Sequence, residues 1–195
     1  MTSPAAPATA LHAPDCSAGR RTLIVLLTFL PFLLKAKGAA LPTVGLGLAL
    51  VFLGGAGGKF TCGWLGARLG VLWTVVLTEG GTAAAILLLL ALPLTPALAV
   101  LPLLGIMLNG TSSVLYGTVP ELTTADRSER SFALFYTGTI GAGAVSPVFY
   151  GLLGDAVGVT WATAATAITA LATLPLAMAL APHLARDQGR RSVEP

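Results

Sequence analysis

Residues 63–71, GWLGARLGV, and residues 151–159, GLLGDAVGV, agree at five of nine positions and begin 88 residues apart. The first stretch joins the second long apolar run of the chain to the third, and the second stretch joins the fifth run to the sixth. Because three runs separate the two stretches, they would lie on opposite faces of a membrane. This placement is typical of an inverted repeat of three helices plus three helices. The alternative is a chance likeness between two glycine-rich connections.

The composition indicates an integral membrane protein. Hydrophobic residues make up 55% of the 195 residues and charged residues only 10%, and the mean hydropathy is +0.85. An average soluble domain has about a quarter of its residues charged, so this chain has too few charges to cover a soluble globule. The net charge of +3 does not indicate nucleic-acid binding, because the eleven basic residues are spread between apolar runs rather than clustered in a patch.

Six apolar runs predict six transmembrane helices. A bilayer core of about 30 Å requires about 20 mostly apolar residues per helix, and five runs are long enough. The first run, Thr22 to Leu34, rises only about 20 Å, so it spans the bilayer only if it extends upstream as far as Leu11. We therefore predict an all-α integral membrane domain over residues 20–182, a disordered leader over 1–19 and a cytoplasmic tail over 183–195. The five longer runs are Ala39 to Leu65, Val71 to Leu92, Ala97 to Thr118, Phe132 to Leu153 and Val159 to Ala181.

The first run has a second interpretation. Arg20 and Arg21 precede it and Ala36-Lys37-Gly38-Ala39 follows it, which resembles a twin-arginine secretory signal with a small-residue cleavage site. Paired basic residues also flank many first membrane helices, and five further runs follow here. We therefore favour an uncleaved helix.

The basic residues predict the orientation. With six crossings, both ends of the chain lie on one side of the membrane, and nine of the eleven basic residues fall on or near that side. Only Lys35 and Lys37 fall on the other. Because basic residues are enriched in cytoplasmic loops, we predict a multi-pass protein of the inner (plasma) membrane with both termini in the cytoplasm. Cys16 and Cys62 then lie towards the reducing side, so we expect no disulfide, metal site or cofactor.

The stretch Gly63-Trp-Leu-Gly66-Ala67-Arg68-Leu-Gly70 resembles the loop pattern Gly-x-Leu-x-Asp-Arg-x-Gly of the major facilitator superfamily, with Ala67 in place of the acid. The resemblance implies that Gly63, Gly66, Arg68 and Gly70, together with Asp155 in the second copy of the repeat, form a conformational-loop motif. Ala67 removes one partner that Arg68 would have in that pattern.

Two further segments resemble the same superfamily. Pro120-Glu121-Leu122, followed by Arg127 and Arg130, resembles the link between its tenth and eleventh helices, and Pro147 with nearby glycines resembles the Gly-Pro motif of its drug/proton antiporters. The resemblance implies the C-terminal half of a twelve-helix secondary transporter of a small molecule, driven by protons. Its partners would be the lipid bilayer, the substrate, and a second six-helix half or a second copy of this chain.

A polar stripe marks the candidate substrate cavity. Asn109, Ser112, Ser113 and Tyr116 follow each other at intervals of three, one and three, so they share one face of a helix. By the resemblance, this helix lines the central cavity together with the first run, which carries Phe29 and Phe32. We expect these six residues to contact the substrate. Hydrogen bonding between helices is the alternative.

Glu79 is the one acid deep within an apolar run, about 12 Å from the start of its helix. A carboxylate at this depth is costly, so we expect it to face protein or water. It is the candidate for proton coupling. The alternative is a protonated acid that bonds a neighbouring helix, because the third helix of each half usually lies outside the transport path in the resembling superfamily.

Small residues line one face in each of two runs. The first set is Gly47, Gly54 and Gly58. Helix faces made of small residues let two helices approach each other closely in lipid. The sequence leaves open whether these faces slide during transport or pack permanently. The second set is Gly143, Pro147, Gly151, Gly154 and Gly158.

Two other functions remain as alternatives. The nearer one is a membrane fragment or packing partner that does not transport. The remote one is a rhomboid-like intramembrane serine protease, because Ser112 and His183 loosely resemble its serine–histidine dyad. A nucleophile needs its base within hydrogen-bond reach, and His183 follows Pro182 at the membrane exit rather than lying on a glycine-flanked helix. We therefore expect no enzymatic activity.

Overall fold

The computed structural model describes the backbone of residues 6–118 and 125–191. Side chains are described for residues 21–109 except 71, and for residues 133–178 except 134, 135, 176 and 177. Within these limits the chain is helical apart from short connections at residues 37–40, 92–93 and 158. The helices are α1 (Ala6–Ala36), α2 (Leu41–Ala91), α3 (Leu94–Thr118), α4 (Ala125–Val157) and α5 (Val159–Arg191). Non-helical geometry at Gly70, with φ 79° and ψ 165°, divides α2 into a first half (41–69) and a second half (71–91).

Glycine lies at three of the breaks between the described helices. Gly38, Gly70 and Gly158 have φ of 87°, 79° and 92°, a left-handed region that only glycine adopts without a Cβ clash. Gly70 and Gly158 occupy equivalent positions in the two copies of the repeat, at the last glycine of each stretch. The two glycines share a positive φ.

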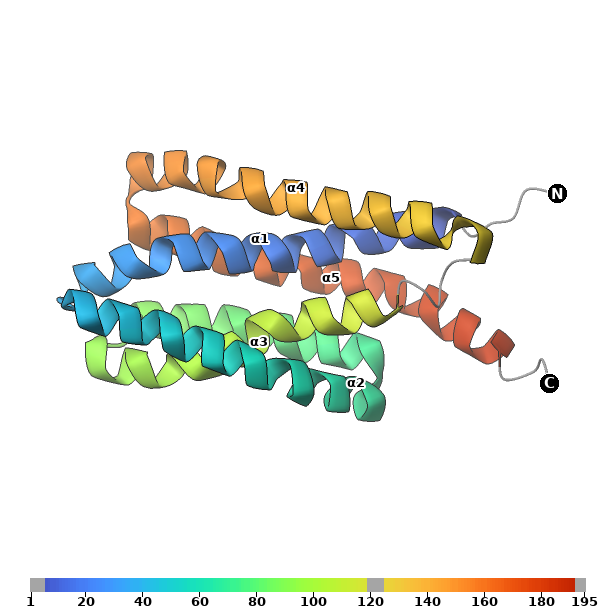
Figure 1. The fold of residues 1–195 in the computed structure, drawn as a ribbon, viewed down its shortest axis with the longest axis horizontal. Helices are drawn as coiled ribbons and strands as arrows, with labels where there is room; N and C mark the ends of the chain where they lie inside the picture. Colours follow the sequence, from blue (N-terminus) through green and yellow to red (C-terminus); the bar gives the residue numbers. More distant parts are fainter. Residues whose placement is uncertain (1–5, 119–124, 192–195) are drawn as a thin grey trace.

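The described residues form six helical rods that run up and down side by side (Figure 1). The start of α1, the break at Gly70 and the end of α5 lie at one end of the bundle, which we call the Gly70 end. The connections at residues 37–40 and 92–93 and the break at Gly158 lie at the opposite end, which we call the Gly158 end. The first and last helices therefore begin and end on the same side, as six crossings demand.

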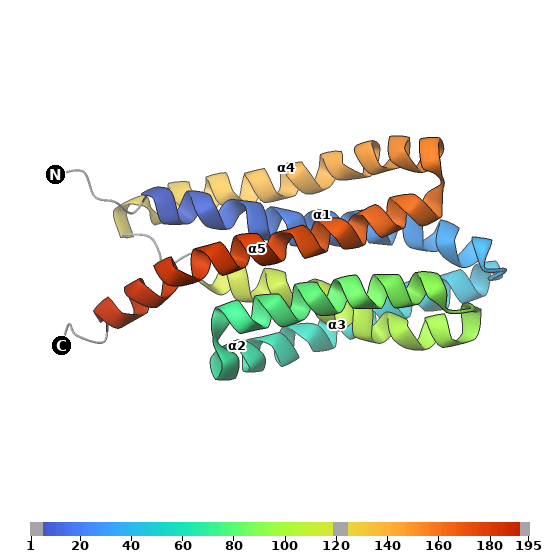
Figure 2. The ribbon, with the colours of Figure 1, turned by 180° about the vertical axis from the view of Figure 1, so that it is seen from behind.

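The rods form two layers. α1, the first half of α2, α3 and α4 face the viewer in Figure 1, whereas α5 and the second half of α2 face the viewer in Figure 2. The strongest packing joins α2 to α3, α2 to α5 and α1 to α4. The pairing of α1 with α4 mirrors that of α3 with the first half of α2, as the repeat predicts. The inverted relation between the two triplets stays a prediction.

Apolar side chains fill the interior and also cover the outside. The interior cluster includes Leu30, Ile86 and Leu101, each with no exposed surface. Large apolar side chains such as Phe52 and Phe149 are exposed on the outside, which suits a lipid environment and not water. By length and composition, three described segments qualify as membrane spans: Leu41–Gly70, Leu72–Ala91 and Tyr136–Val157. Leu94–Asn109 and Val159–Pro175 are shorter apolar helices.

The helix boundaries differ from the predicted ones in three places. α1 already begins at Ala6, so residues 6–19 are helical rather than a disordered leader, because this stretch is rich in alanine, the best helix former. α5 continues to Arg191 and includes most of the predicted tail. Residues 66–69 and 154–157, which lie between the predicted runs, are helical, because a single positive-φ glycine, Gly70 or Gly158, suffices to end a helix.

Candidate functional site

Buried threonines occur on the second half of α2 and on α5, and α2 packs against α5. Thr74, Thr78 and Thr82 follow each other at intervals of four along α2, and all are buried. On α5 three further threonines are buried: Thr163, Thr166 and Thr173. We call this set of six buried threonines on two packed helices the threonine interface.

The threonine hydroxyls bond to the backbone of their own helices. The Thr78 hydroxyl donates to the Thr74 carbonyl oxygen at 2.8 Å, and the Thr166 hydroxyl donates to the Ala162 carbonyl oxygen at 3.0 Å. Such bonds to the preceding helical turn satisfy a hydroxyl without any partner from another helix. The threonine interface therefore brings oxygen atoms into a lipid-embedded bundle at little energetic cost.

Glu79 lies beside this interface. Its side chain is 2% exposed, and it follows the buried Thr78 directly in the chain. The residue therefore points into the bundle and not towards lipid. Its helix belongs to the layer seen in Figure 2, together with α5. A carboxyl group held at this depth is a candidate for reversible protonation.

Asn109 lies at the contact between α3 and α2. Its amide nitrogen donates to the Gly105 carbonyl oxygen at 3.3 Å, and its side chain fills the space that a Cβ at Gly55 would need. The glycine at position 55 thus makes room for the polar side chain. Ser112, Ser113 and Tyr116 continue along α3, but their side chains, and that of His183, lie outside the described residues.

Phe29 and Phe32 of α1 point in different directions. Phe29 is 7% exposed and packs with Val25 and Ala162, close to Gly154 of α4. Phe32 is 57% exposed. The structure therefore does not bring these two rings together, and in this conformation Phe29 is part of the core between α1, α4 and α5.

The glycine face of α2 packs tightly against α3. A Cβ at Gly54 would collide with the Pro102 carbonyl oxygen, and a Cβ at Gly58 would lie 2.6 Å from that of Ile106. A Cβ at Gly105 of α3 would likewise collide with the Val51 carbonyl oxygen. Small residues on both helices therefore bring the two backbones into contact. The glycine face of α2 was predictable from its spacing in the sequence, whereas its counterpart on α3, Gly105, was not.

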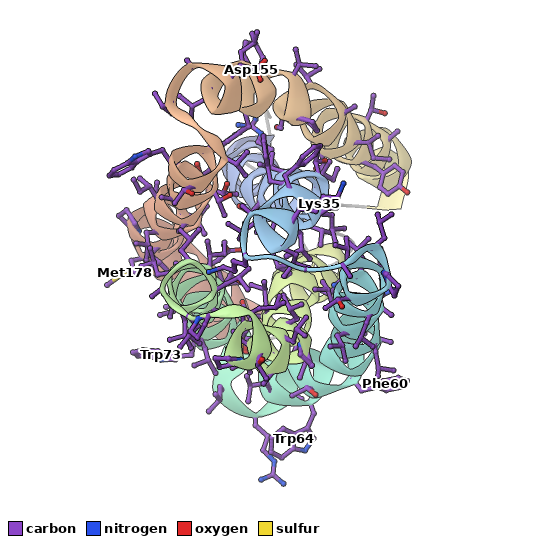
Figure 3. The ribbon with its side chains drawn as sticks, turned by 90° about the vertical axis from the view of Figure 1, so that its left-hand side faces the viewer. Lys35, Phe60, Trp64, Trp73, Asp155 and Met178 are labelled. Carbon is purple, nitrogen blue, oxygen red and sulfur yellow. The ribbon has the colours of Figure 1, made fainter. Side chains whose placement is uncertain are left out.

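The conformational-loop motif is divided between the two ends of the bundle. Gly63 is exposed and has open space around its Cβ position. The Arg68 guanidinium lies 4.6 Å from the centre of the Trp64 ring, near the Gly70 end. Asp155 is exposed at the other end, three residues before Gly158 (Figure 3). Arg68 and Asp155 therefore cannot pair with each other within one chain.

Lys37 makes a contact that the sequence analysis did not anticipate. Its ammonium group donates to the Leu92 carbonyl oxygen at 2.6 Å and to the Leu90 carbonyl oxygen at 3.1 Å. These carbonyls lie at the C-terminal end of α2, where backbone oxygens lack helical partners and a cation is favourable. Lys37 thereby fastens the connection after α1 to the end of α2.

The described residues hold no group of three or more His, Cys, Asp or Glu side chains that could bind a metal ion. Cys62 is a free, buried thiol.

Comparison with known protein families finds a match that covers most of the chain. A family model described as Major Facilitator Superfamily matches residues 17–194, a range that contains all but the first turns of α1 and every other helix. No curated protein matches the sequence.

Proposed function

The chain belongs to the major facilitator superfamily of membrane transporters, and we propose that its six helices form one half of a secondary active transporter for a small molecule. The family match along 17–194 carries this proposal. In such transporters one half rocks against the other around a binding site near the middle of the membrane. Both termini would face the cytoplasm, which agrees with the distribution of basic residues and with the common location of the start of α1 and the end of α5.

The transport unit on this proposal contains a second six-helix unit, either another copy of this chain or a separate half. The outer side of α4, with the adjacent part of α1, is the surface that would meet it. α4 supports this assignment, because only 11% of its apolar segment is buried within the bundle. In the second half of α2 the corresponding share is 50%. Gly138 and Gly141 of α4 have open space around their Cβ positions, which suits close approach by a further helix.

We propose Glu79 as the proton-coupling residue. Its burial inside the bundle supports this role, because a charged carboxylate is costly within a membrane and ionisable residues there commonly belong to proton pathways. When the site opens to one side of the membrane, water would enter and Glu79 would release its proton. The protonation of Glu79 would then depend on the side to which the site is open.

Proton flux in everted membrane vesicles tests both parts of the proposal. The vesicles are acidified inside by respiration, the pH gradient is followed with an acridine dye, and organic cations, sugars and amino acids are added in turn. A coupled solute partly collapses the gradient in vesicles with the unaltered chain. We expect Glu79→Gln to abolish this effect while exchange of the same radiolabelled solute continues.

The control substitution is Glu79→Asp, which keeps a titratable group. If Glu79→Gln couples protons as well as the unaltered chain, Glu79 only stabilises helix packing. If no solute class moves protons or exchanges across the vesicle membrane, the chain does not transport by itself, and the proposal that a second copy of it completes the transport unit fails.

A further inference from the structure

A graded stripe of side chains runs along the outside of α2 towards the Gly70 end. Phe60, Trp64 and Arg68 follow each other at intervals of four, so they share one face of the helix. Phe60 is 84% exposed and Trp64 is 56% exposed, and Arg68 is exposed as well. Figure 3 shows Phe60 and Trp64 at the edge of the bundle, pointing away from its interior.

The order of these side chains matches the profile of a membrane leaflet. Each step of four residues advances about 6 Å along the helix, from a purely apolar ring, to an indole, to a guanidinium two residues before the helix breaks at Gly70. Tryptophan prefers the interface between hydrocarbon and headgroups, and basic side chains prefer the headgroup level. The stripe therefore spans the boundary from acyl chains to headgroups.

Arg68 is held on the face of Trp64. The guanidinium carbon lies 4.6 Å from the ring centre, within the range of a cation–π contact. Stacking uses the flat face of the guanidinium and leaves its N–H edge available for a planar, bidentate contact with a phosphate. The preceding residue, Ala67, supplies no carboxylate to neutralise the charge.

We propose that Arg68 and Trp64 form a binding site for the headgroup of an anionic phospholipid, such as phosphatidylglycerol, in the leaflet at the Gly70 end. The acyl chains of this lipid lie along Phe60 and Gly57. Gly57 is exposed with open space around its Cβ position, and so leaves room beside the phenyl ring. Charge complementarity selects the anionic lipid, because nine of the eleven basic residues fall on or near this side of the membrane. The proposal rests on membership of the membrane family and not on transport activity.

Tryptophan quenching by brominated lipids tests the site. The chain has three tryptophans, so Trp73→Phe with Trp161→Phe leaves Trp64 as the only reporter. The protein is placed in phosphatidylcholine nanodiscs that contain a small fraction of brominated phosphatidylglycerol or of brominated phosphatidylcholine. We expect the anionic lipid to quench Trp64 at about one fifth of the molar fraction that the neutral lipid requires. This is the preference for anionic lipid that one basic side chain near the membrane surface provides.

Two matched variants localise the effect. Trp161 is exposed near the Gly158 end, so the protein with Trp64→Phe and Trp73→Phe reports a tryptophan outside the site and should show no preference. In the Trp64 protein, Arg68→Gln should remove the preference but keep the quenching by brominated phosphatidylcholine, which shows that the helix still meets the bilayer.

Salt provides a measurement that needs no change at Arg68. At about 1 M salt the Debye length falls to about 3 Å, and the preference of the Trp64 protein for the anionic lipid should decline strongly. Equal quenching of Trp64 by the two lipids would overturn the proposal. So would a preference that survives Arg68→Gln or that is unchanged at high salt.

Discussion

Replacing Lys37 by methionine should destabilise the protein measurably. Methionine keeps the length of the apolar stem but removes the ammonium group, so the Leu90 and Leu92 carbonyl oxygens lose the donor that lies 3.1 and 2.6 Å away. A hydrogen bond that involves a charged group contributes about 1.5–3 kcal/mol, and a cation at a helix C-terminus contributes about 0.3–1 kcal/mol. Lys37 is only half-buried, so water replaces part of the lost bonding.

We therefore expect a loss of about 2 kcal/mol in the free energy of unfolding. For a chain of this size, about 1 kcal/mol corresponds to a shift of roughly 2–4 °C in the melting temperature, so Lys37→Met should lower it by about 4–8 °C. Thermal unfolding of the purified protein in a mild detergent, followed by circular dichroism, measures this shift.

Lys35→Met is the matched control. Lys35 lies two residues earlier and is exposed, and no hydrogen bond of its ammonium group is found in the described part of the chain. Its loss should therefore change the melting temperature by less than about 1 °C, as is usual for exposed substitutions. Equal shifts for Lys35→Met and Lys37→Met would mean that net charge at this end matters and not the contact with α2. No shift in either variant would refute the reasoning.

Three further predictions concern packing, orientation and the polar stripe. Gly54→Ala should lower the free energy of unfolding by about 1–3 kcal/mol, because the new Cβ would collide with the Pro102 carbonyl oxygen. Gly57→Ala should be neutral or stabilising, because the space around that Cβ position is open. Chemical denaturation of the two variants compares these effects. Cysteine placed at Lys35 should react with an impermeant maleimide in intact cells and cysteine at Arg127 should not, and the reverse pattern would contradict the proposed orientation. In a chain whose own cysteines are replaced by serine, cysteine at Ser113 should react with a small water-soluble thiol reagent and cysteine at Val114 should not; equal reactivity would show that the stripe does not line a water-filled path.

Much of the fold could be predicted from composition and from the apolar runs. A chain with so few charges can only cover its apolar surface with lipid, and the length of a bilayer crossing divides the sequence into six helices. The breaks at Gly70 and Gly158 were predictable from the repeat, because glycine readily adopts a positive φ. The helical state of residues 6–19 was not predicted, because prolines and polar residues accompany the alanines in this stretch.

The candidate site could be predicted only in part. The depth of Glu79 in its helix follows from counting residues, and its burial is what a costly charge in lipid demands. The different surroundings of Phe29 and Phe32 could not be predicted from the resemblance, which assigned both rings to the same cavity. Whether Asn109 and the rest of its stripe contact substrate stays a prediction.

The sequence by itself therefore determined the class, the number of helices, their breaks and which residues share a helix face. The tertiary structure alone decided which neighbour each face meets. It placed Asn109 against Gly55, the glycines of α2 against the carbonyls of α3, and Lys37 on backbone oxygens more than 50 residues away in the chain. The physical reason is that helical periodicity depends on local backbone geometry, whereas contacts between helices in a lipid environment depend on the shapes of two surfaces that are distant in the sequence.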